Sequence, residues 1–244
     1  VIACISKLTE QIVKSVTPNV ERHYLPHAVD GKFFKKLPKD EIDKFLNENF
    51  SVAKDKKIFF WNNRNARRKQ SGTLIWWFKE WLDKVGQDKA CLLMHTDARD
   101  PHGQDLPHII EALGANKGQI FLSTNKVDSA ELALMYNAAD YTINISDAEG
   151  FGLSTLESLS CGTPIIVNMT GGLQEQVTNG TDWFGWGIQP SSKTVIGSLQ
   201  VPYIYEDRMS QQDFEATLTK ALKLSPAKYK KMSLMGREHI KNNY

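Results

Sequence analysis

The stretch DAEGFGLSTLESLSCGTPIIVNMTGGLQEQV, residues 147–177, decides the fold of this chain. The apolar residues 141–146 come directly before it and predict a buried strand. A turn with two glycines follows at 149–152, and residues 153–160 then show the apolar spacing of a helix. Gly162 stands where a helix C-terminus favours glycine, and the next apolar run begins after it. The stretch therefore predicts strand, glycine turn, helix and strand in close succession.

This arrangement suits an anion. The first N–H groups of a helix have no partner within the helix, and the helix dipole adds partial positive charge there. Glycine lets the backbone come close to a ligand, so a phosphate can rest on the N–H groups of Gly152 and Leu153. Glu149 and Glu157 flank that spot and can accept hydrogen bonds from sugar hydroxyls. The pattern indicates a nucleotide-sugar site.

A second interpretation of Glu157 stays open. Residues 154–157, Ser-Thr-Leu-Glu, match a capping box, in which Glu157 would only cap its own helix. A strand, glycine turn and helix also occur in many α/β proteins that bind nothing at that place.

Alternating strand and helix patterns extend over residues 57–177. They predict an α/β fold with a parallel sheet that helices cover on both faces. Such sheets bind ligands beyond the carboxyl ends of their strands. The connections expected at that edge share this position: residues 62–69, 95–105, 123–127 and 147–152. After residue 177 the pattern predicts a long loop over 182–198, a short edge strand at 202–206, and helices over 210–222 and 227–242.

Seven residues separate Glu149 from Glu157, and this spacing resembles the E-x7-E motif of retaining glycosyltransferases with the GT-B fold, in particular the family-4 group. The following Gly171-Gly172 before a helix with a glutamate also resembles that family. The resemblance implies a Rossmann-like, doubly wound parallel sheet, the C-terminal donor-binding half of a GT-B enzyme. It covers the chain from about Val1 to Tyr244, with weaker stretches.

The resemblance also implies site residues. The basic loop after the first strand of the sheet places Arg64 and Lys69 where the family has an arginine and a lysine that bind the donor diphosphate. Fixed cations suit a diphosphate leaving group, which gains charge as the glycosidic bond breaks. Two departures stand beside these cations, because Asn63 and Gln70 replace the usual glycines. Two neighbours leave open which cations face the ligand: Arg67 and Arg68.

The family's roles therefore make Arg64, Lys69 and Glu149 the expected catalytic residues. The expected donor-binding residues come from the motif and from the loop beside the nucleobase: Gly150, Phe151, Gly152, Leu153, Ser154, Glu157, Lys126 and Val127. Residues 95–97, His-Thr-Asp, are a further candidate lining of the nucleotide pocket, although an ordinary polar loop explains them as well.

Six potential metal ligands lie in and just after the second of these loops: His95, Asp97, Asp100, His102, Asp105 and His108. Their spacing fits no known ligand motif, so we expect no metal. The resemblance agrees, since family-4 enzymes use a helix terminus and an Arg–Lys pair instead. The sequence thus predicts a nucleotide-sugar as substrate and no cofactor.

Composition and length place further bounds. The 244 residues carry a net charge of +2, so no overall field indicates nucleic acid. Three widely spaced cysteines, Cys4, Cys91 and Cys161, predict buried thiols in a reducing compartment. No apolar run reaches the ~18 residues of a membrane-spanning helix, and no signal peptide pattern is present. We expect a cytoplasmic protein that, at full length, can lie peripherally at a membrane.

The predicted organisation is a hinge segment with a surface excursion over residues 1–50 and a nucleotide-sugar-binding domain over 51–244. The resemblance implies that the N-terminal acceptor domain is missing, so we expect this chain to bind donor but transfer little sugar. The implied reaction is retaining transfer of a hexose to an acceptor hydroxyl on an unknown sugar, lipid or protein. Two alternatives remain: a GT-B epimerase or phosphorylase, and a non-catalytic nucleotide-binding module.

Overall fold

A computed structural model describes residues 1–53 and 55–244 of the chain. Six parallel strands form the central sheet in the order β5-β4-β3-β6-β7-β8. The strands of this sheet are β3 (Lys57–Asn62), β4 (Ala90–His95), β5 (Ile120–Ser123), β6 (Tyr141–Asn144), β7 (Ile165–Asn168) and β8 (Gly185–Ile188). The order reverses direction between β3 and β6, which makes the sheet doubly wound, as the sequence predicted.

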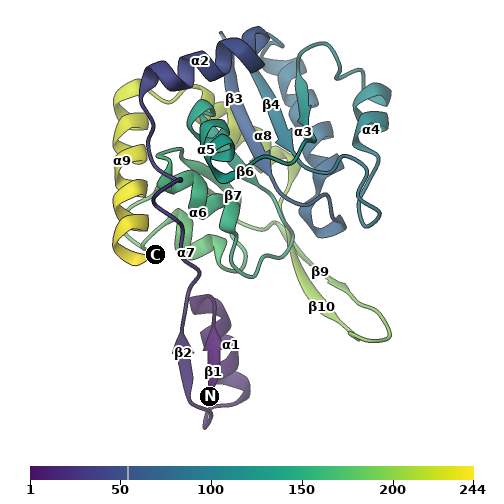
Figure 1. Ribbon diagram of the computed structural model, residues 1–244. Coiled ribbons are helices and arrows are strands. Elements are labelled where there is room, and N and C mark those ends of the chain that lie inside the picture. Colours follow the sequence, from purple (N-terminus) through teal and green to yellow (C-terminus); the bar gives the residue numbers. More distant parts are fainter. Residues whose placement is uncertain (54) are drawn as a thin grey trace.

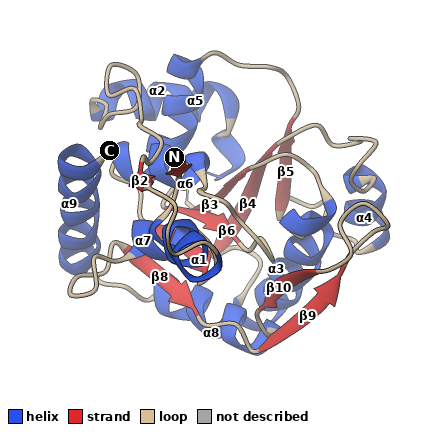
Figure 2. Cartoon of the chain, turned by 90° about the horizontal axis from the view of Figure 1, so that it is seen from below, coloured by secondary structure: helices blue, strands red, loops and turns tan. Residues whose placement is uncertain are grey.

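Helices cover both faces of the sheet (Figures 1 and 2). One face carries α3 (Ser71–Val85), α4 (Leu106–Ala112) and α8 (Gln211–Leu222). The other face carries α2 (Lys39–Asn49), α5 (Ser129–Ala138), α6 (Leu153–Ser160), α7 (Leu173–Val177) and α9 (Pro226–Asn243).

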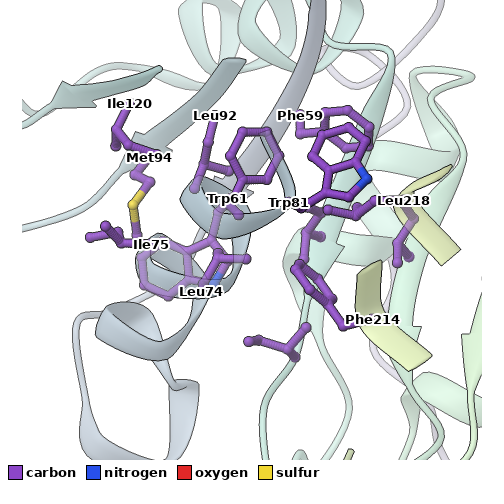
Figure 3. Close-up of a cluster of buried hydrophobic side chains, with 14 of the residues drawn as sticks. Phe59, Trp61, Leu74, Ile75, Trp81, Leu92, Met94, Ile120, Phe214 and Leu218 are labelled. Carbon is purple, nitrogen blue, oxygen red and sulfur yellow. The ribbon is translucent and has the colours of Figure 1, made fainter. Parts of the chain in front are cut away.

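The period-two alternation of β3 builds both layers of the core. Phe59 and Trp61 pack with α3 on one face, and Phe60 packs with Tyr136 of α5 on the other. The α3 face holds a dense aromatic cluster around Phe59 and Trp81, whose ring centroids lie 5.7 Å apart (Figure 3). The aromatic stripe of α3 is thus a packing face, and it fixes the first strand and helix that carry the site.

Polar caps set the start of several helices, as their sequences indicate. The side chain of Asp128 accepts from the Glu131 N–H at 2.9 Å at the start of α5. Ser210 does the same for Asp213 at 3.0 Å in α8. Gly162 follows α6 with φ +81°, a conformation that glycine adopts without strain.

The first residues form a small βαβ unit that lies beside the main domain (Figure 1): β1 (Ile2–Cys4), α1 (Lys7–Val16) and the parallel β2 (Arg22–Tyr24). One carboxylate joins it to α7. Glu175 accepts from the Lys7 N–H at 2.7 Å and from the Tyr24 hydroxyl at 2.8 Å. The domain boundary at residue 50 stays a prediction.

The expected long loop at 182–198 is wrong. Residues 185–188 are β8, the edge strand of the central sheet, where Gly185 packs against the backbone of Ile165 so closely that a Cβ would collide with it. The hairpin β9 (Ser192–Ile196) and β10 (Ile204–Arg208) then projects from the domain (Figure 1). Its tip exposes apolar residues, with Leu199 at 99%.

The three cysteines are buried and unpaired, as predicted. Burial raises the pKa of both Cys91 and Cys161 to about 12, which keeps these thiols protonated and unreactive at neutral pH. None of the helices in the described ranges is long and apolar enough to span a membrane.

Candidate functional site

The site lies at the carboxyl ends of β3 and β6, where the strand order reverses. A cleft of about 560 Å³ opens there. Its lining includes most of the residues that the sequence singled out: Arg64, Lys69, Glu149, Gly150, Phe151, Gly152, Leu153, Ser154 and Glu157. Residues 64 and 69 come from the loop after β3, and the others from the turn after β6 and from α6. The doubly wound topology therefore brings two separate parts of the sequence into one cleft.

The N-terminus of helix α6 lies at the cleft, and the first N–H groups of a helix have no partner within the helix. The helix begins at Leu153 after Gly152, which has φ +97° and supplies no side-chain cap. Leu153 and Ser154 line the cleft at this terminus. The unpaired N–H groups and the helix dipole make it a place for an anion.

A second helix, α7, holds the glycine turn in shape. Gln176 is fully buried; its amide donates to the Phe151 carbonyl at 2.8 Å, and its Oε1 accepts from the Thr155 hydroxyl at 2.6 Å. The Gly172 N–H donates to the Glu149 carbonyl at 3.3 Å. Gly171, with φ +51°, lies so close to that carbonyl that no Cβ fits. Because Gly171 and Gly172 have no side chains, the N-terminus of α7 can pack directly against the backbone of the turn at 149–152.

Lys69 is the central cation of the cleft. Its side chain is only 9% exposed, and its ammonium pairs with the carboxylate of Glu149. The amide oxygen of Asn63 accepts a second hydrogen bond from Lys69 at 2.9 Å. Burial lowers the pKa of Lys69, and the charge of Glu149 opposes that shift. Asn63, which departs from the family pattern, thus helps to fix the lysine, and its own Nδ2 is buried without a partner among the described residues.

Arg64 lines the same cleft, and residues of the loop between β4 and α4 bind its guanidinium. Its Nε donates to Asp100 Oδ2 at 2.6 Å and its Nη2 to Asp100 Oδ1 at 3.2 Å. His102 Nδ1 lies 2.8 Å from the same Nη2. The side chain of Arg64 remains 60% exposed.

The structure also separates the two ambiguous arginines. Arg67 turns away from the cleft and grips Glu206 at the base of the hairpin, with Nη2 to Oε1 at 2.6 Å. Arg68 lines the cleft and donates to the Ala148 carbonyl at 2.6 Å. Of these two arginines, Arg68 is therefore the one that faces the cleft. All three arginines and Lys69 belong to the loop that contains the short 3₁₀ turn η2 (Arg67–Lys69).

Glu157 does not form the capping box that its spacing allowed. The helix begins one residue before Ser154, and the carboxylate instead accepts from the Tyr136 hydroxyl at 2.7 Å. That hydroxyl accepts in turn from Asn62 Nδ2 at 2.8 Å. Burial raises the pKa of Glu157, although the bond from Tyr136 opposes the shift. A half-buried carboxylate at the cleft wall is thus available to a ligand hydroxyl.

Glu157→Gln is expected to stabilise the chain at pH 7. The pKa of Glu157 is higher in the folded state than in the unfolded state. The free energy of unfolding therefore falls as pH rises from the unfolded-state pKa through the folded-state pKa. A neutral glutamine still accepts from Tyr136, so we expect a gain of about 1 kcal/mol. Urea unfolding at pH 7 and at pH 4, where the gain should shrink, measures it. The exposed Glu111→Gln is the control. A less stable E157Q chain at pH 7 contradicts the raised pKa of Glu157.

Other predicted residues lie elsewhere. Lys126 is exposed and Val127 packs on the α2–α5 side of the core, and neither lines the cleft. His95 Nδ1 lies 3.0 Å from the Ser123 hydroxyl. The six potential metal ligands do not converge, since no group of three or more such side chains forms a site within residues 1–53 and 55–244. Asp105 instead caps α4 through the His108 N–H at 3.0 Å.

The sequence did not indicate several residues of the site. His27 lines the cleft, and its ring meets Phe151 edge-on at 5.2 Å. Ile5 and Leu132 also line it. Their contacts depend on how distant segments pack, so no local pattern could reveal them.

Comparison with known proteins gives a consistent result. The family model described as "Glycosyl transferases group 1" matches residues 42–239. An alpha-monoglucosyldiacylglycerol synthase from Streptococcus pneumoniae is 28% identical over 168 residues, 68% of this chain and 37% of that protein. A D-inositol 3-phosphate glycosyltransferase from Corynebacterium jeikeium is 31% identical over 127 residues, 51% of this chain and 30% of that protein. The chain thus spans about a third of these relatives.

Solved structures share the fold. A glycosyltransferase from Rickettsia africae superimposes with a TM-score of 0.77 at 18% identity, covering 99% of this chain and 58% of that one. The Anabaena protein HepE, solved in complex with UDP and glucose, gives 0.75 at 13% identity, covering 100% and 59%. The six-stranded parallel sheet therefore matches that of GT-B proteins.

Proposed function

Because the chain belongs to the group 1 family of glycosyl transferases, we propose that its cleft is the donor site of a longer glycosyltransferase and binds a nucleoside-diphospho-sugar. One observation carries the proposal. Lys69 and the free N–H groups of α6 meet Glu149 in one cleft at the switch point of the sheet. An anion site flanked by a hydroxyl-binding carboxylate suits a sugar joined to a diphosphate.

In this proposal each group has one role. Lys69 and Arg64 bind the diphosphate and stabilise the charge that it gains as the glycosidic bond breaks. Glu149 and the backbone of residues 151–153 hold sugar hydroxyls and phosphate oxygens. Glu157, oriented by Tyr136, accepts a hydrogen bond from the ribose. The cations and the helix terminus do the work that a metal does in other transferases, and the hexose keeps its anomeric configuration.

The donor class can be tested directly on this chain. A ligand that binds only the folded state raises its thermal stability, so UDP-, GDP- and ADP-sugars are compared with UDP, GDP and ADP. HepE, whose structure holds UDP and glucose, makes a uridine donor the first to try. If none of these compounds shifts the unfolding midpoint, the proposed donor site is wrong.

Glu149→Gln separates a donor site from a plain nucleotide-binding module. In a donor site the carboxylate binds the sugar, so E149Q is expected to lower the ratio of nucleotide-sugar affinity to nucleoside diphosphate affinity about tenfold. A module without sugar contacts predicts an unchanged ratio. Calorimetric titration of both ligands measures it, with Glu111→Gln as the charge-matched control on the exposed face of α4.

The full-length protein decides between transfer and related GT-B chemistry. A labelled nucleotide-sugar should give a glycoside of retained configuration together with free nucleoside diphosphate. An epimerised nucleotide-sugar, or a sugar phosphate formed from inorganic phosphate, would instead identify an epimerase or a phosphorylase.

A further inference from the structure

The loop between β4 and α4, residues 96–105, is hydrogen-bonded to and packed against the loop after β3, which carries Arg64 and Lys69. Asn65 Nδ2 donates to the Gln104 carbonyl at 2.7 Å, and the Gly72 N–H donates to Gln104 Oε1 at 2.9 Å. Gly103 packs so tightly on the Asn65 carbonyl that a Cβ would overlap it. The second loop is therefore fixed to the first right beside Arg64.

Asp100 is the residue of the second loop that touches a cation. Its carboxylate accepts a bidentate pair of hydrogen bonds from Arg64, from Nε at 2.6 Å and from Nη2 at 3.2 Å. Its own carboxylate is anchored, because Oδ1 also accepts from the His102 N–H at 2.8 Å, and its side chain is only 9% exposed. The Arg64 guanidinium holds the pKa of Asp100 well below its usual range, so the carboxylate is charged at any physiological pH.

This contact leaves one nitrogen of Arg64 free. A guanidinium has five N–H groups in a fixed plane, and Asp100 and His102 together occupy the Nε–Nη2 edge. Among the described residues Nη1 has no hydrogen-bond partner, while Arg64 lines the cleft with Lys69. The geometry leaves Nη1 as the group that can meet an oxygen of a ligand.

Resting on the proposed donor site, we propose that Asp100 is a positioning residue that fixes the guanidinium of Arg64 so that Nη1 faces the diphosphate. An arginine has many rotamers and loses that freedom when it binds a ligand. Asp100 restricts them before the ligand arrives, so less freedom is lost on binding. The substrate class addressed is any nucleoside diphosphate or its sugar ester.

The sign of one substitution tests this idea. A carboxylate near an anion site normally weakens anion binding, so removing a mere bystander should tighten it. Removing a positioning residue should loosen it. Binding of UDP, GDP and ADP is measured by calorimetry, and the nucleotide that binds most tightly serves for all variants: D100N, R64Q, the double variant, R64K, and E111Q as the charge-matched control.

We expect D100N to weaken nucleotide binding about tenfold, equivalent to about 1.4 kcal/mol. In the R64Q background the same change should add no further weakening, because Asp100 acts only through Arg64. E111Q should leave the affinity unchanged. R64K keeps the charge but cannot make the bidentate contact with Asp100. It should therefore weaken nucleotide binding about as much as R64Q does, without altering the 96–105 loop.

The outcomes separate the two levels of the proposal. If the unmodified chain binds none of the three nucleotides, the donor site and this inference both fail. If nucleotides bind but R64Q changes nothing, the role of Arg64 and this inference fail while nucleotide binding stands. If R64Q weakens binding but D100N tightens it or leaves it unchanged, or R64K binds normally, only the positioning role of Asp100 is wrong.

Discussion

Gly171→Ala is expected to lower the free energy of unfolding by about 4 kcal/mol or more. Gly171 combines a positive φ of +51° with a Cβ position that overlaps the Glu149 carbonyl oxygen. Alanine therefore has to push the glycine turn away from α7, which also breaks the Gly172 N–H bond to the same carbonyl. The fold around α6 and the shape of the cleft depend on this packing together with the hydrogen bonds of Gln176 to the turn. Urea unfolding with a fluorescence or circular dichroism readout measures the loss.

Gly114→Ala is the matched control. Gly114 has a similar φ of +64°, but a Cβ there meets nothing within 4 Å. Its loss should be about 1 kcal/mol, the usual backbone strain of a left-handed alanine. The difference between the two variants isolates the collision with Glu149. Equal losses would mean that α7 does not support the turn as described.

Lys69→Met should abolish most nucleoside diphosphate binding. Methionine replaces the unbranched stem of lysine as far as Cε but carries no ammonium group, so the diphosphate loses a buried charge-assisted hydrogen bond. We expect about 100-fold weaker binding in calorimetric titration, because hydrogen bonds to charged groups in a desolvated site contribute about 1.5–3 kcal/mol each. Lys117→Met is the control, since it removes the same charge at the opposite edge of the sheet, before β5. Equal affinities of K69M and K117M would contradict the assignment of Lys69.

Stability needs a separate control, because K69M leaves the buried Glu149 carboxylate with only its longer contact to Arg68 Nη1, at 3.5 Å. Removing one partner of a buried ion pair destabilises a protein more than removing both. The double variant K69M/E149Q should therefore recover stability relative to K69M. It should not recover diphosphate affinity. Recovery of both properties would show that K69M weakens binding only by disturbing the fold.

Much of this architecture could be predicted from local sequence patterns. The motif helix at 153–160 has the predicted bounds, because its apolar spacing and the glycines on either side of it define the helix. The parallel sheet followed from the alternation of strands and helices. The meeting of Lys69 with Glu149 in one cleft followed from the topology, since both lie after strands at the same edge of the sheet.

Other features depend on packing between distant segments. β8 contains two glycines and a tryptophan, residues that suit a loop as well as a strand. Its pairing with β7, in which Gly185 packs closely against Ile165, makes it an edge strand. The partner of Arg64 lies thirty-six positions away on another loop, so no local pattern distinguishes Asp100 from its acidic neighbours. Likewise the spacing of Glu157 suits a helix cap as well as a ligand-binding carboxylate. Only the packing of Tyr136, whose hydroxyl donates to Glu157, distinguishes the two.

The tip of the β9–β10 hairpin makes the chain vulnerable to one kind of protease. Residues 194–205 contain no lysine or arginine, so trypsin has no site there, whereas Leu199, Tyr203 and Tyr205 are exposed targets for chymotrypsin. Brief digestion should cut the molecule into two pieces. β8 on one side and α8 on the other remain packed in the core, so the nicked halves should stay together and migrate as a single species until denaturant separates them.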